Sequence, residues 1–429
     1  MKSINTPFFV LLLLGVLSGC SGGGSLSSLS SEIPEVTDLS FGEDGFRLSS
    51  FGGTAVLIDG RAMDISERGE IVITGHLETL QSGGKNIGVM LMDSDGDLVE
   101  SFGDQGQVSL DLGLNNVAKA VGFQGKNVVI ASQEGPYIVL TRVDENGNLD
   151  ASFQGDGSFR EDRVDSLNYI HVISMKVDAQ DRIYIGGYVT PGKSLLLRYL
   201  PDGEPDVSFG SDGIVVIEHD FGLKQGFVDL LPDGRVVLGA LLSDGTQEFS
   251  AAVLCFLEDG SLDTSFGDEG NGMQSVNFNE GDYGLYIRGL GVDSLGRIVV
   301  VSSNNYQNLA SSRAVIFRLD SEGQQDLTFG DDGLQIIAGG ASLGLFKPVF
   351  DGDKIVIGGY IRENLFDTKP IIARLLDSGA VDETYGYKGV GVLEVGQFSE
   401  ARDTAIYGGR YYVGGYIGDD QMMVGAARP

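Results

Sequence analysis

Short runs of Val, Ile, Leu and Tyr recur along the whole chain, and each is bounded by Gly, Asp or Asn. Runs of this composition predict β-strands separated by turns. The most regular runs are almost continuously apolar, which predicts strands that are buried on both faces. These runs cover residues 71–73, 128–130, 183–185, 236–238, 298–300, 355–357 and 411–413.

The runs come in groups of four, as residues 272–278, 285–293, 297–303 and 313–320 illustrate. Tight turns separate the second run from the third, for example Pro232-Asp233-Gly234. Gly and Asp tolerate positive φ, so such turns suit antiparallel hairpins. Each group of four runs therefore predicts one four-stranded antiparallel sheet.

A Ser-Phe-Gly-x-x-Gly motif precedes each group, most fully as Leu262-Asp263-Thr264-Ser265-Phe266-Gly267-Asp268-Glu269-Gly270. The spacing between copies averages about 57 residues, a period typical of solenoids and propellers. A residue that is filled once per repeat usually serves the repeat, so we expect the motif aromatics to pack between sheets. They are Phe41, Phe102, Phe153, Phe209, Phe266, Phe329 and Tyr385.

A second repeated feature is an arginine placed eight residues before the aspartate that precedes the motif. The pairs are Arg142 with Asp150, Arg198 with Asp206, Arg318 with Asp326, and Arg374 with Asp382. In the first repeat both charges are absent, with Leu91 and Val99 in their places. Joint loss predicts contact, because a buried charge without its partner costs ~3–5 kcal/mol.

One arginine and one aspartate stay unmatched at the two ends of the array, Arg428 and Asp38. If they pair as the others do, the ends of the repeat array meet and the sheets close into a ring. Closure also removes exposed sheet edges. The sequence therefore predicts an all-β fold, a seven-bladed β-propeller of four-stranded antiparallel blades over residues 38–429.

The motif, the Gly-Arg-Ile-Val-Val-like strand and the arginine-bearing fourth strand resemble the delta-60 repeat proteins of bacteria. The resemblance covers residues 38–429 and implies an exported β-propeller with no established activity. It supplies no catalytic or binding residues. Gln154 and Tyr385 depart from the repeat pattern, where Gly and Phe are usual.

The N-terminus has the features of an export signal: Lys2, an apolar run over residues 8–17, and Leu17-Ser18-Gly19-Cys20. That tetrapeptide resembles the lipobox of bacterial lipoproteins. The resemblance implies a signal peptide over residues 1–19 and lipidation of Cys20, with palmitate-type acyl chains anchoring the protein in the membrane. Residues 20–37 would then be the lipidated cysteine and a Gly/Ser-rich tether. Ser21 after the cysteine favours the bacterial outer membrane. An ordinary secretory signal and an uncleaved anchor are the alternatives.

The formal net charge is −32, and Cys20 and Cys255 are the two cysteines. A chain this acidic is not expected to bind nucleic acid, and it favours cationic partners or divalent cations. With Cys20 lipidated, no intramolecular disulfide is available.

Motifs for catalysis or cofactor binding are weak. Residues 187–194 match the phosphate-loop pattern, but the repeat register places a strand rather than a helix after them. Asp93-Ser94-Asp95-Gly96-Asp97 resembles the start of a calcium loop without completing one. We therefore expect no catalytic, cofactor or metal residues, with calcium at a turn as the alternative.

The function expected from the sequence is a lipid-anchored scaffold of the cell envelope that binds a protein or a glycan, and not an enzyme. Divergent loops would carry the specificity while the repeats carry the fold. The long insertions at residues 79–86, 304–312 and 362–369 are the first places to look for it. A propeller enzyme, lactonase-like or glycan-cleaving, and a purely structural envelope lipoprotein are the alternatives.

Overall fold

The computed structural model describes residues 11–12, 34–51, 55–79, 84–113, 115–163, 169–190, 192–219, 222–243, 249–277, 285–304, 313–338, 342–364, 367–396, 398–418 and 421–429. The predicted signal peptide, Cys20 and most of the tether lie outside these ranges, apart from β1 (Leu11–Leu12), which pairs in parallel with β22. Of the three long insertions, residues 80–83, 305–312 and 365–366 lie outside them as well.

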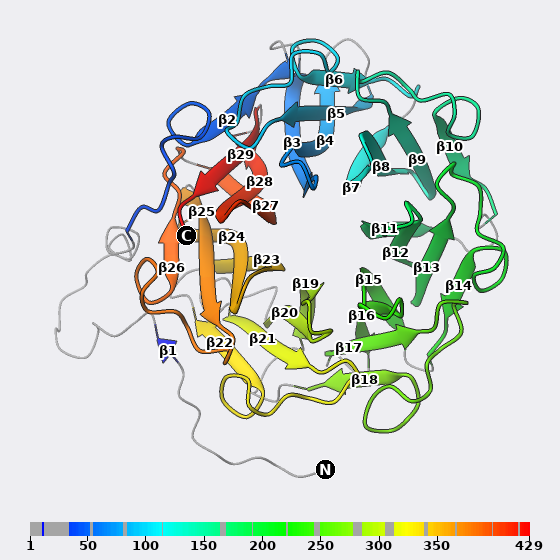
Figure 1. The fold of residues 1–429 in the computed structure, drawn as a ribbon, viewed down its shortest axis with the longest axis vertical. Helices are drawn as coiled ribbons and strands as arrows, with labels where there is room; N and C mark the ends of the chain where they lie inside the picture. The colour runs from blue at the N-terminus through cyan, green and yellow to red at the C-terminus, as the bar shows by residue number, and fades with distance from the viewer. Residues whose placement is uncertain are drawn as a thin grey trace.

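The described chain forms a seven-bladed β-propeller, as predicted, with four antiparallel strands in each blade (Figure 1). The innermost strand of every blade lines a central channel. Written from the channel outward, the blades are β3 (Ala55–Ile65), β4 (Ile71–Thr79), β5 (Lys85–Met92) and β6 (Gln107–Leu110); β7 (Asn116–Gln124), β8 (Asn127–Glu134), β9 (Tyr137–Val143) and β10 (Ser158–Glu161); β11 (Ile170–Val177), β12 (Ile183–Val189), β13 (Lys193–Tyr199) and β14 (Ile214–Ile217); β15 (Leu223–Leu230), β16 (Val236–Ser243), β17 (Phe249–Phe256) and β18 (Met273–Val276); β19 (Leu285–Val292), β20 (Ile298–Asn304), β21 (Arg313–Leu319) and β22 (Leu334–Ala338); β23 (Ser342–Asp351), β24 (Lys354–Asn364), β25 (Asp367–Leu376) and β26 (Val390–Val392); and β27 (Ser399–Tyr407), β28 (Arg410–Ile417), β29 (Gln421–Ala427) and β2 (Phe46–Ser49).

Sequence repeats and blades are offset by one strand. The first run of each repeat, which follows the motif, forms the outermost strand of the preceding blade, so one repeat does not make one blade as we expected. In the last blade the outermost strand is β2, which pairs antiparallel with β29 from Phe46 opposite Gly425 to Ser49 opposite Met422. The two ends of the array therefore close the ring. Pro34 to Thr37, expected in the tether, also hydrogen-bond to the outer strands of the last two blades.

The core lies between blades, where the second strands are buried on both faces, as their continuous apolar pattern predicted. One cluster joins Val299 and Val301 of β20 to Leu343 and Ile357 of the next blade. At some positions adjacent blades leave no room for a Cβ: one on Gly186 would lie 2.3 Å from the Gly226 carbonyl oxygen of the next blade. Close backbone approach thus explains glycine within a buried strand.

The motif fastens each blade to the next. Its aromatic is fully or almost fully buried in all seven copies. In the copy at Phe209, the Gly210 amide donates to the Asp259 carbonyl of the following repeat at 2.7 Å, and the Arg198 guanidinium lies 4.4 Å from the ring centroid. These aromatics are structural and are not exposed to stack on a ligand.

Candidate functional site

The channel wall carries a β-bulge at the same height in every blade. In each innermost strand the pairing register with the second strand slips, between Gly60 and Ala62 in β3 and between Ala401 and Asp403 in β27, for example. A bulge re-aims the extra side chain, and bulges are frequent beside active sites. The corresponding slips in the other blades lie at 118/120, 172/174, 224/227, 287/289 and 345/348.

Five of the seven bulges contain a cation, and in four of them, all but the one with Lys347, the cation occupies the equivalent position. We call Arg61, Lys119, Arg288 and Arg402 the basic layer. The equivalent positions in the other three blades are Ile173, Gly226 and Phe346. The bulge layer therefore holds cations and uncharged residues, with no carboxylate among its members.

Three carboxylates that lie one to three residues after the bulge position of their innermost strand are engaged by the backbone of a neighbouring blade. Asp403 Oδ2 accepts from the Met63 amide at 3.0 Å, and Asp64 Oδ2 accepts from the Phe123 amide at 3.0 Å. Asp229 likewise accepts from the Val292 amide at 3.0 Å. These acids join neighbouring innermost strands, and backbone amides of the protein already donate hydrogen bonds to their carboxylates.

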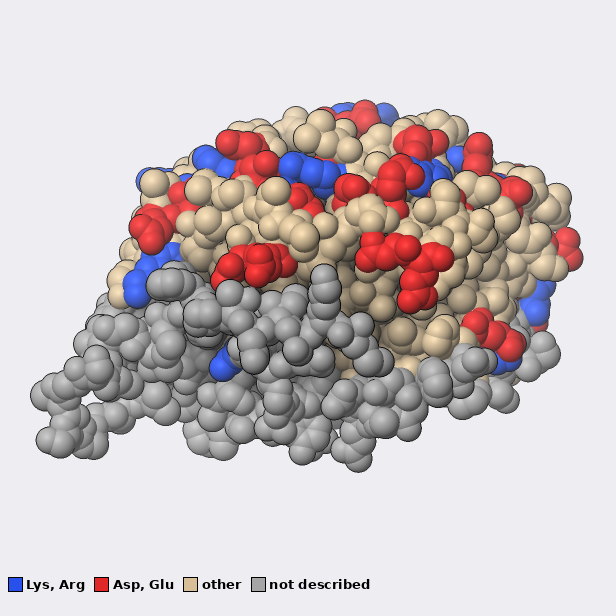
Figure 2. All heavy atoms as spheres, turned by 90° about the horizontal axis from the view of Figure 1, so that it is seen from below, with Lys and Arg blue, Asp and Glu red and all other residues tan. Residues whose placement is uncertain are grey.

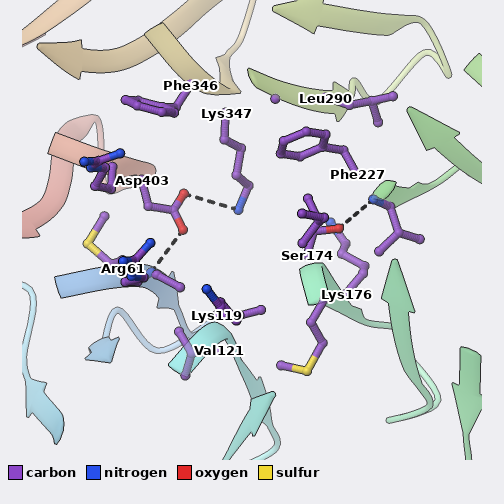
Figure 3. A pocket seen from close by; sticks show the side chains of 18 of the residues that line it. Arg61, Lys119, Val121, Ser174, Lys176, Phe227, Leu290, Phe346, Lys347 and Asp403 are labelled. Atoms are coloured by element: carbon purple, nitrogen blue, oxygen red, sulfur yellow. Dashed lines mark hydrogen bonds and ion pairs between the residues drawn. The ribbon is translucent and has the colours of Figure 1, made fainter. Parts of the chain in front are cut away.

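The basic layer lines a cavity of about 140 Å³ in the channel (Figure 3). Six cations and two carboxylates contribute to its wall, since Lys176 and Lys347 join the basic layer opposite Asp229 and Asp403. The chain as a whole carries a net charge of −32. Its outer wall shows many Asp and Glu side chains with Lys and Arg among them (Figure 2). The cavity is thus a cationic site in an acidic protein.

The members of the basic layer differ in how their charge is neutralised. Arg61 pairs with Asp59 at 2.5 Å, and Arg402 pairs with Glu400 at 2.6 Å. Arg288 Nε donates to the Ser303 hydroxyl at 2.9 Å. Among the described residues, Lys119 makes no hydrogen bond or ion pair. Burial and the neighbouring Arg61 lower the pKa of Lys119 to about 8.

Aromatic side chains flank the basic layer on the side where the innermost strands begin. His171 stacks on Tyr188 with centroids 4.3 Å apart, and Tyr169 packs against His171 at 4.8 Å. Across the channel, the Arg402 guanidinium lies 5.7 Å from the centroids of Phe346 and Tyr416. Aromatic faces beside cations suit a ligand that combines rings with negative charge.

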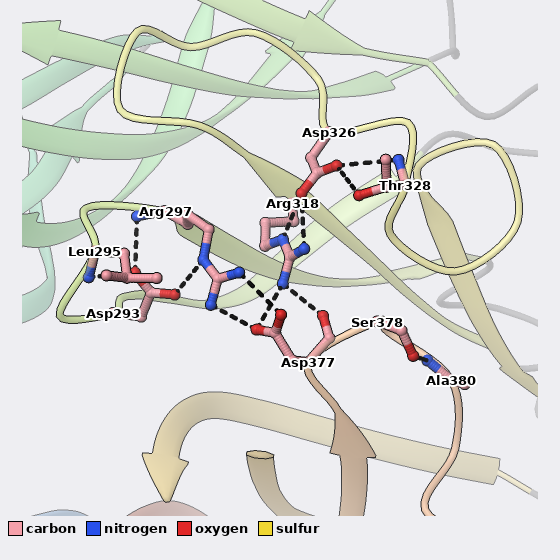
Figure 4. Close-up of polar contacts among 9 residues, drawn as sticks. All are labelled: Asp293, Leu295, Arg297, Arg318, Asp326, Thr328, Asp377, Ser378 and Ala380. Atoms are coloured by element: carbon pink, nitrogen blue, oxygen red, sulfur yellow. Dashed lines mark hydrogen bonds and ion pairs between the residues drawn. The ribbon is translucent and has the colours of Figure 1, made fainter. Parts of the chain in front are cut away.

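The predicted ion pairs form at four inter-blade junctions. Their Nε to Oδ2 distances are 2.8 Å for Arg142 and Asp150, 2.7 Å for Arg198 and Asp206, 2.8 Å for Arg318 and Asp326, and 2.8 Å for Arg374 and Asp382. Each guanidinium of the first three pairs also donates to a carbonyl in the next blade's turn, as Arg318 does to Asp377 at 2.6 Å (Figure 4). Burial alone would raise the pKa of these carboxyls, but hydrogen bonds from Ser or Thr and from the arginine outweigh it and lower the pKa.

Ring closure uses a different arginine from the one we expected. Arg410 Nε donates to Asp38 Oδ2 at 2.8 Å, whereas Arg428 Nε lies 3.5 Å from Oδ1 with its side chain 66% exposed. In the last blade, Ala426 occupies the position that an arginine holds in the four paired blades. The guanidinium that reaches Asp38 comes instead from Arg410, at the start of β28. The blade of β15 to β18 shows the same substitution. Cys255 stands where the other blades have an arginine, and Arg235 pairs with Asp263 at 3.0 Å in its place.

The remaining sequence candidates behave as turns and strands. After the phosphate-loop match, Lys193 begins strand β13 and pairs with Glu218. Asp93 accepts hydrogen bonds from the amides of Asp95 and Asp97, at 2.9 and 3.0 Å, which closes its hairpin turn. Within the described ranges, no group of acidic, His or Cys side chains has the arrangement of a metal site, and no helix could cross a membrane.

Sequence reasoning missed the basic layer. The available signal was a Lys or Arg at one register in the second run of four repeats, in a chain with 29 Lys and Arg residues. The apolar residues identify those runs as strands, but an apolar pattern does not show where a bulge turns a side chain into the channel.

The family model of the domain of unknown function DUF5122 beta-propeller matches residues 181–209 and 231–266. A comparison with curated proteins finds no match. Among solved structures, a polysaccharide lyase, an ulvan lyase with -[GlcA(1-4)Rha3S]- bound, is similar at 9% identity and a TM-score of 0.50, covering 89% of this chain and 96% of that chain.

Two further solved structures are similar at lower TM-scores. The β-propeller domain of the Trilobed protease from Pyrococcus furiosus has 8% identity and a TM-score of 0.46, covering 87% of this chain and 94% of that chain. An alpha-L-arabinofuranosidase from Clostridium thermocellum has 9% identity and a TM-score of 0.34, covering 66% of this chain and 94% of that chain. At these identities the likeness is one of fold alone.

These comparisons correct the prediction that the protein is not an enzyme. The ulvan lyase, a solved structure with a TM-score of 0.50 to this chain, is an enzyme with a similar fold. The prediction rested on the lack of a linear catalytic motif in the sequence. A propeller gathers side chains from different blades at one channel, so a site built this way leaves no such motif.

Proposed function

We propose that the protein acts on an anionic glycan and that the basic layer of the channel binds the carboxylate or sulfate groups of that glycan. The observation that carries this proposal is the set of four cations on equivalent bulges, Arg61, Lys119, Arg288 and Arg402. Cations gathered at one height in an acidic protein attract an anion through both local contacts and field focusing.

The aromatic groups favour a saccharide over a simple inorganic anion. Tyr188 and Tyr416 occupy the same register in β12 and β28. Tyr169, which is 42% exposed, packs against His171 on the Tyr188 side of the channel. Sugar rings present apolar faces that pack on aromatic rings, while their acidic groups reach the cations. The ulvan lyase with -[GlcA(1-4)Rha3S]- bound supports the proposal only as an example of a saccharide held by a propeller of similar fold.

The size of the cavity limits how much of the glycan enters it. Cavities of roughly 150 Å³ hold a molecule the size of benzene. A cavity of about 140 Å³ therefore accepts one acidic group or one terminal ring rather than a threaded chain. We expect the rest of the glycan to lie across the aromatic side chains at the mouth.

A polysaccharide panel tests this function. We would measure binding to a polyuronate, a sulfated polysaccharide and a neutral polysaccharide, and would assay the same mixtures for new chain ends. Binding to one of the acidic polymers, reduced by salt and by Arg402→Gln, supports the proposal, and new chain ends would add cleavage to it. Equal binding to neutral and acidic polymers, or none to any of them, would refute it.

We further propose that the protein works at the cell envelope, held by lipid on Cys20. The support is the Leu17-Ser18-Gly19-Cys20 sequence. Acyl chains contribute ~0.8 kcal/mol per buried methylene, so several of them anchor a protein durably. Cys20→Ala should abolish labelling by a palmitate analogue and release the protein from membranes, and retained labelling would refute the assignment.

A further inference from the structure

Lys119 is the member of the basic layer whose charge is least compensated. It is the extra residue of the bulge between Ala118 and Ala120 in β7, and its side chain points into the cavity beside Arg61 (Figure 3). Among the described residues it has no hydrogen-bond acceptor and no ion-pair partner, whereas Arg61 and Arg402 each hold a carboxylate.

The charged groups around Lys119 come from three strands. Arg61 and Lys85 repel its positive charge, Asp59 attracts it, and Lys119 in turn disfavours protonation of His171. Burial is the largest influence, and together these groups lower the pKa of Lys119 from 10.5 to about 8. At pH 7 this makes the neutral amine roughly 300-fold more abundant than for an ordinary lysine.

We propose that Lys119 is a nucleophilic amine that forms an imine with a small oxo acid, an aldehyde or ketone that also carries a carboxylate. A lysine beside other cations in a partly desolvated site is a common arrangement for imine chemistry. The inference uses the same basic layer as the proposed function but does not require the natural ligand to be a saccharide.

The reaction balances without an oxidant or reductant. The Lys119 Nζ lone pair attacks the carbonyl carbon, and the π electrons of the carbonyl move to its oxygen. Proton transfers from nitrogen to oxygen then allow that oxygen to leave as water, and a C=N bond remains. The carboxylate of the oxo acid lies against Arg61 and Arg402, which hold the carbonyl carbon near Nζ. The cavity of about 140 Å³ accommodates a molecule of this size.

Reductive trapping tests the inference on the full chain. The protein is incubated with glyoxylate and cyanoborohydride at a series of pH values, and the modified lysines are located and quantified by peptide mass spectrometry. Lys126, whose side chain is 63% exposed, is the internal comparison. We expect Lys119 to be modified at least tenfold faster than Lys126 at pH 7, with a rate that rises through pH 8.

Two further comparisons separate this inference from general lysine reactivity and from the proposed function. Glycolaldehyde, which lacks the carboxylate, should modify Lys119 more slowly than glyoxylate does. Arg61→Gln should slow the modification of Lys119 and leave that of Lys126 unchanged, in a protein that still gives the circular dichroism of a propeller. A polyuronate, if it binds as proposed, should protect Lys119 from glyoxylate.

Equal modification of Lys119 and Lys126 would overturn the inference, and so would equal rates with glyoxylate and glycolaldehyde. Fast, glyoxylate-selective modification of Lys119 without protection by any acidic polysaccharide would support the reactive lysine while counting against the glycan proposal. If an acidic polysaccharide protects Lys119 but glyoxylate does not modify Lys119 selectively, the glycan proposal is supported and the reactive lysine is refuted.

Discussion

The closure of the ring predicts a sharp difference between two arginines that both approach Asp38. Arg410 donates to Asp38 at 2.8 Å and to the Ser94 carbonyl at 2.6 Å, which joins β28 to the first motif and to the first blade. Its side chain is 22% exposed, and that of Asp38 is 10% exposed. Removing one partner of a buried ion pair costs ~3–5 kcal/mol. Because Arg410 is partly exposed, we expect Arg410→Gln to lower the free energy of unfolding by less, ~2–3 kcal/mol.

Arg428 is the matched control, because its side chain is 66% exposed and its nitrogen lies 3.5 Å from Asp38. Exposed pairs contribute ~0–1 kcal/mol, so we expect Arg428→Gln to cost less than ~0.5 kcal/mol. The usual entropy of unfolding per residue converts these free energies into changes of Tm. In differential scanning calorimetry, Arg410→Gln should lower Tm by about 3 °C and Arg428→Gln by less than about 1 °C. Equal losses, or a larger loss for Arg428→Gln, would refute this account of closure.

Three other predictions follow from the packing and from the ends of the chain. Burial lowers the pKa of His76 from 6.5 to about 4, so the unfolded chain takes up a proton first as the pH falls. The free energy of unfolding should therefore drop by up to ~3 kcal/mol between pH 6.5 and 4. Urea titrations of His76→Gln should show a smaller dependence of this free energy on pH. An unchanged dependence would count against a buried neutral histidine. A Cβ on Gly415 would lie 1.9 Å from the Glu400 carbonyl oxygen, so Gly415→Ala should cost ~1–3 kcal/mol or more in the same titrations, and a neutral effect would contradict the close approach. Cys20→Ala should move the protein from the membrane pellet to the soluble fraction, as lipid anchoring requires.

The fold was predictable because its determinants are local and repeated. Apolar runs such as residues 298–300 mark a buried second strand in each blade, and the motif aromatic fills the same place seven times. The offset between repeats and blades was not predictable from the runs alone. It depends on which sheet accepts the strand after each motif, and this is decided by pairing across the junction.

The closing arginine and the basic layer were missed for a common reason. Both depend on where a long side chain reaches in space rather than on its spacing in the sequence. Arg410 reaches Asp38 from the neighbouring strand because Ala426 occupies the expected position. Lys119 faces the channel because of a bulge, and a bulge shifts the alternation that an apolar pattern assumes. A search for charged residues at equivalent positions inside the runs would have found the layer.

The most direct test of the central claim is a calorimetric titration with a matched pair of ligands, an oligogalacturonate and its methyl-esterified form, which keeps the rings and removes the charge. We expect the acidic form to bind and salt to weaken this binding. We also expect Arg61→Gln combined with Arg402→Gln to lower the affinity at least tenfold, which is ~1.4 kcal/mol. The esterified form should bind weakly. Equal affinities for the two forms, or an affinity that the double variant leaves unchanged, would contradict the claim that the basic layer of the channel is the binding site.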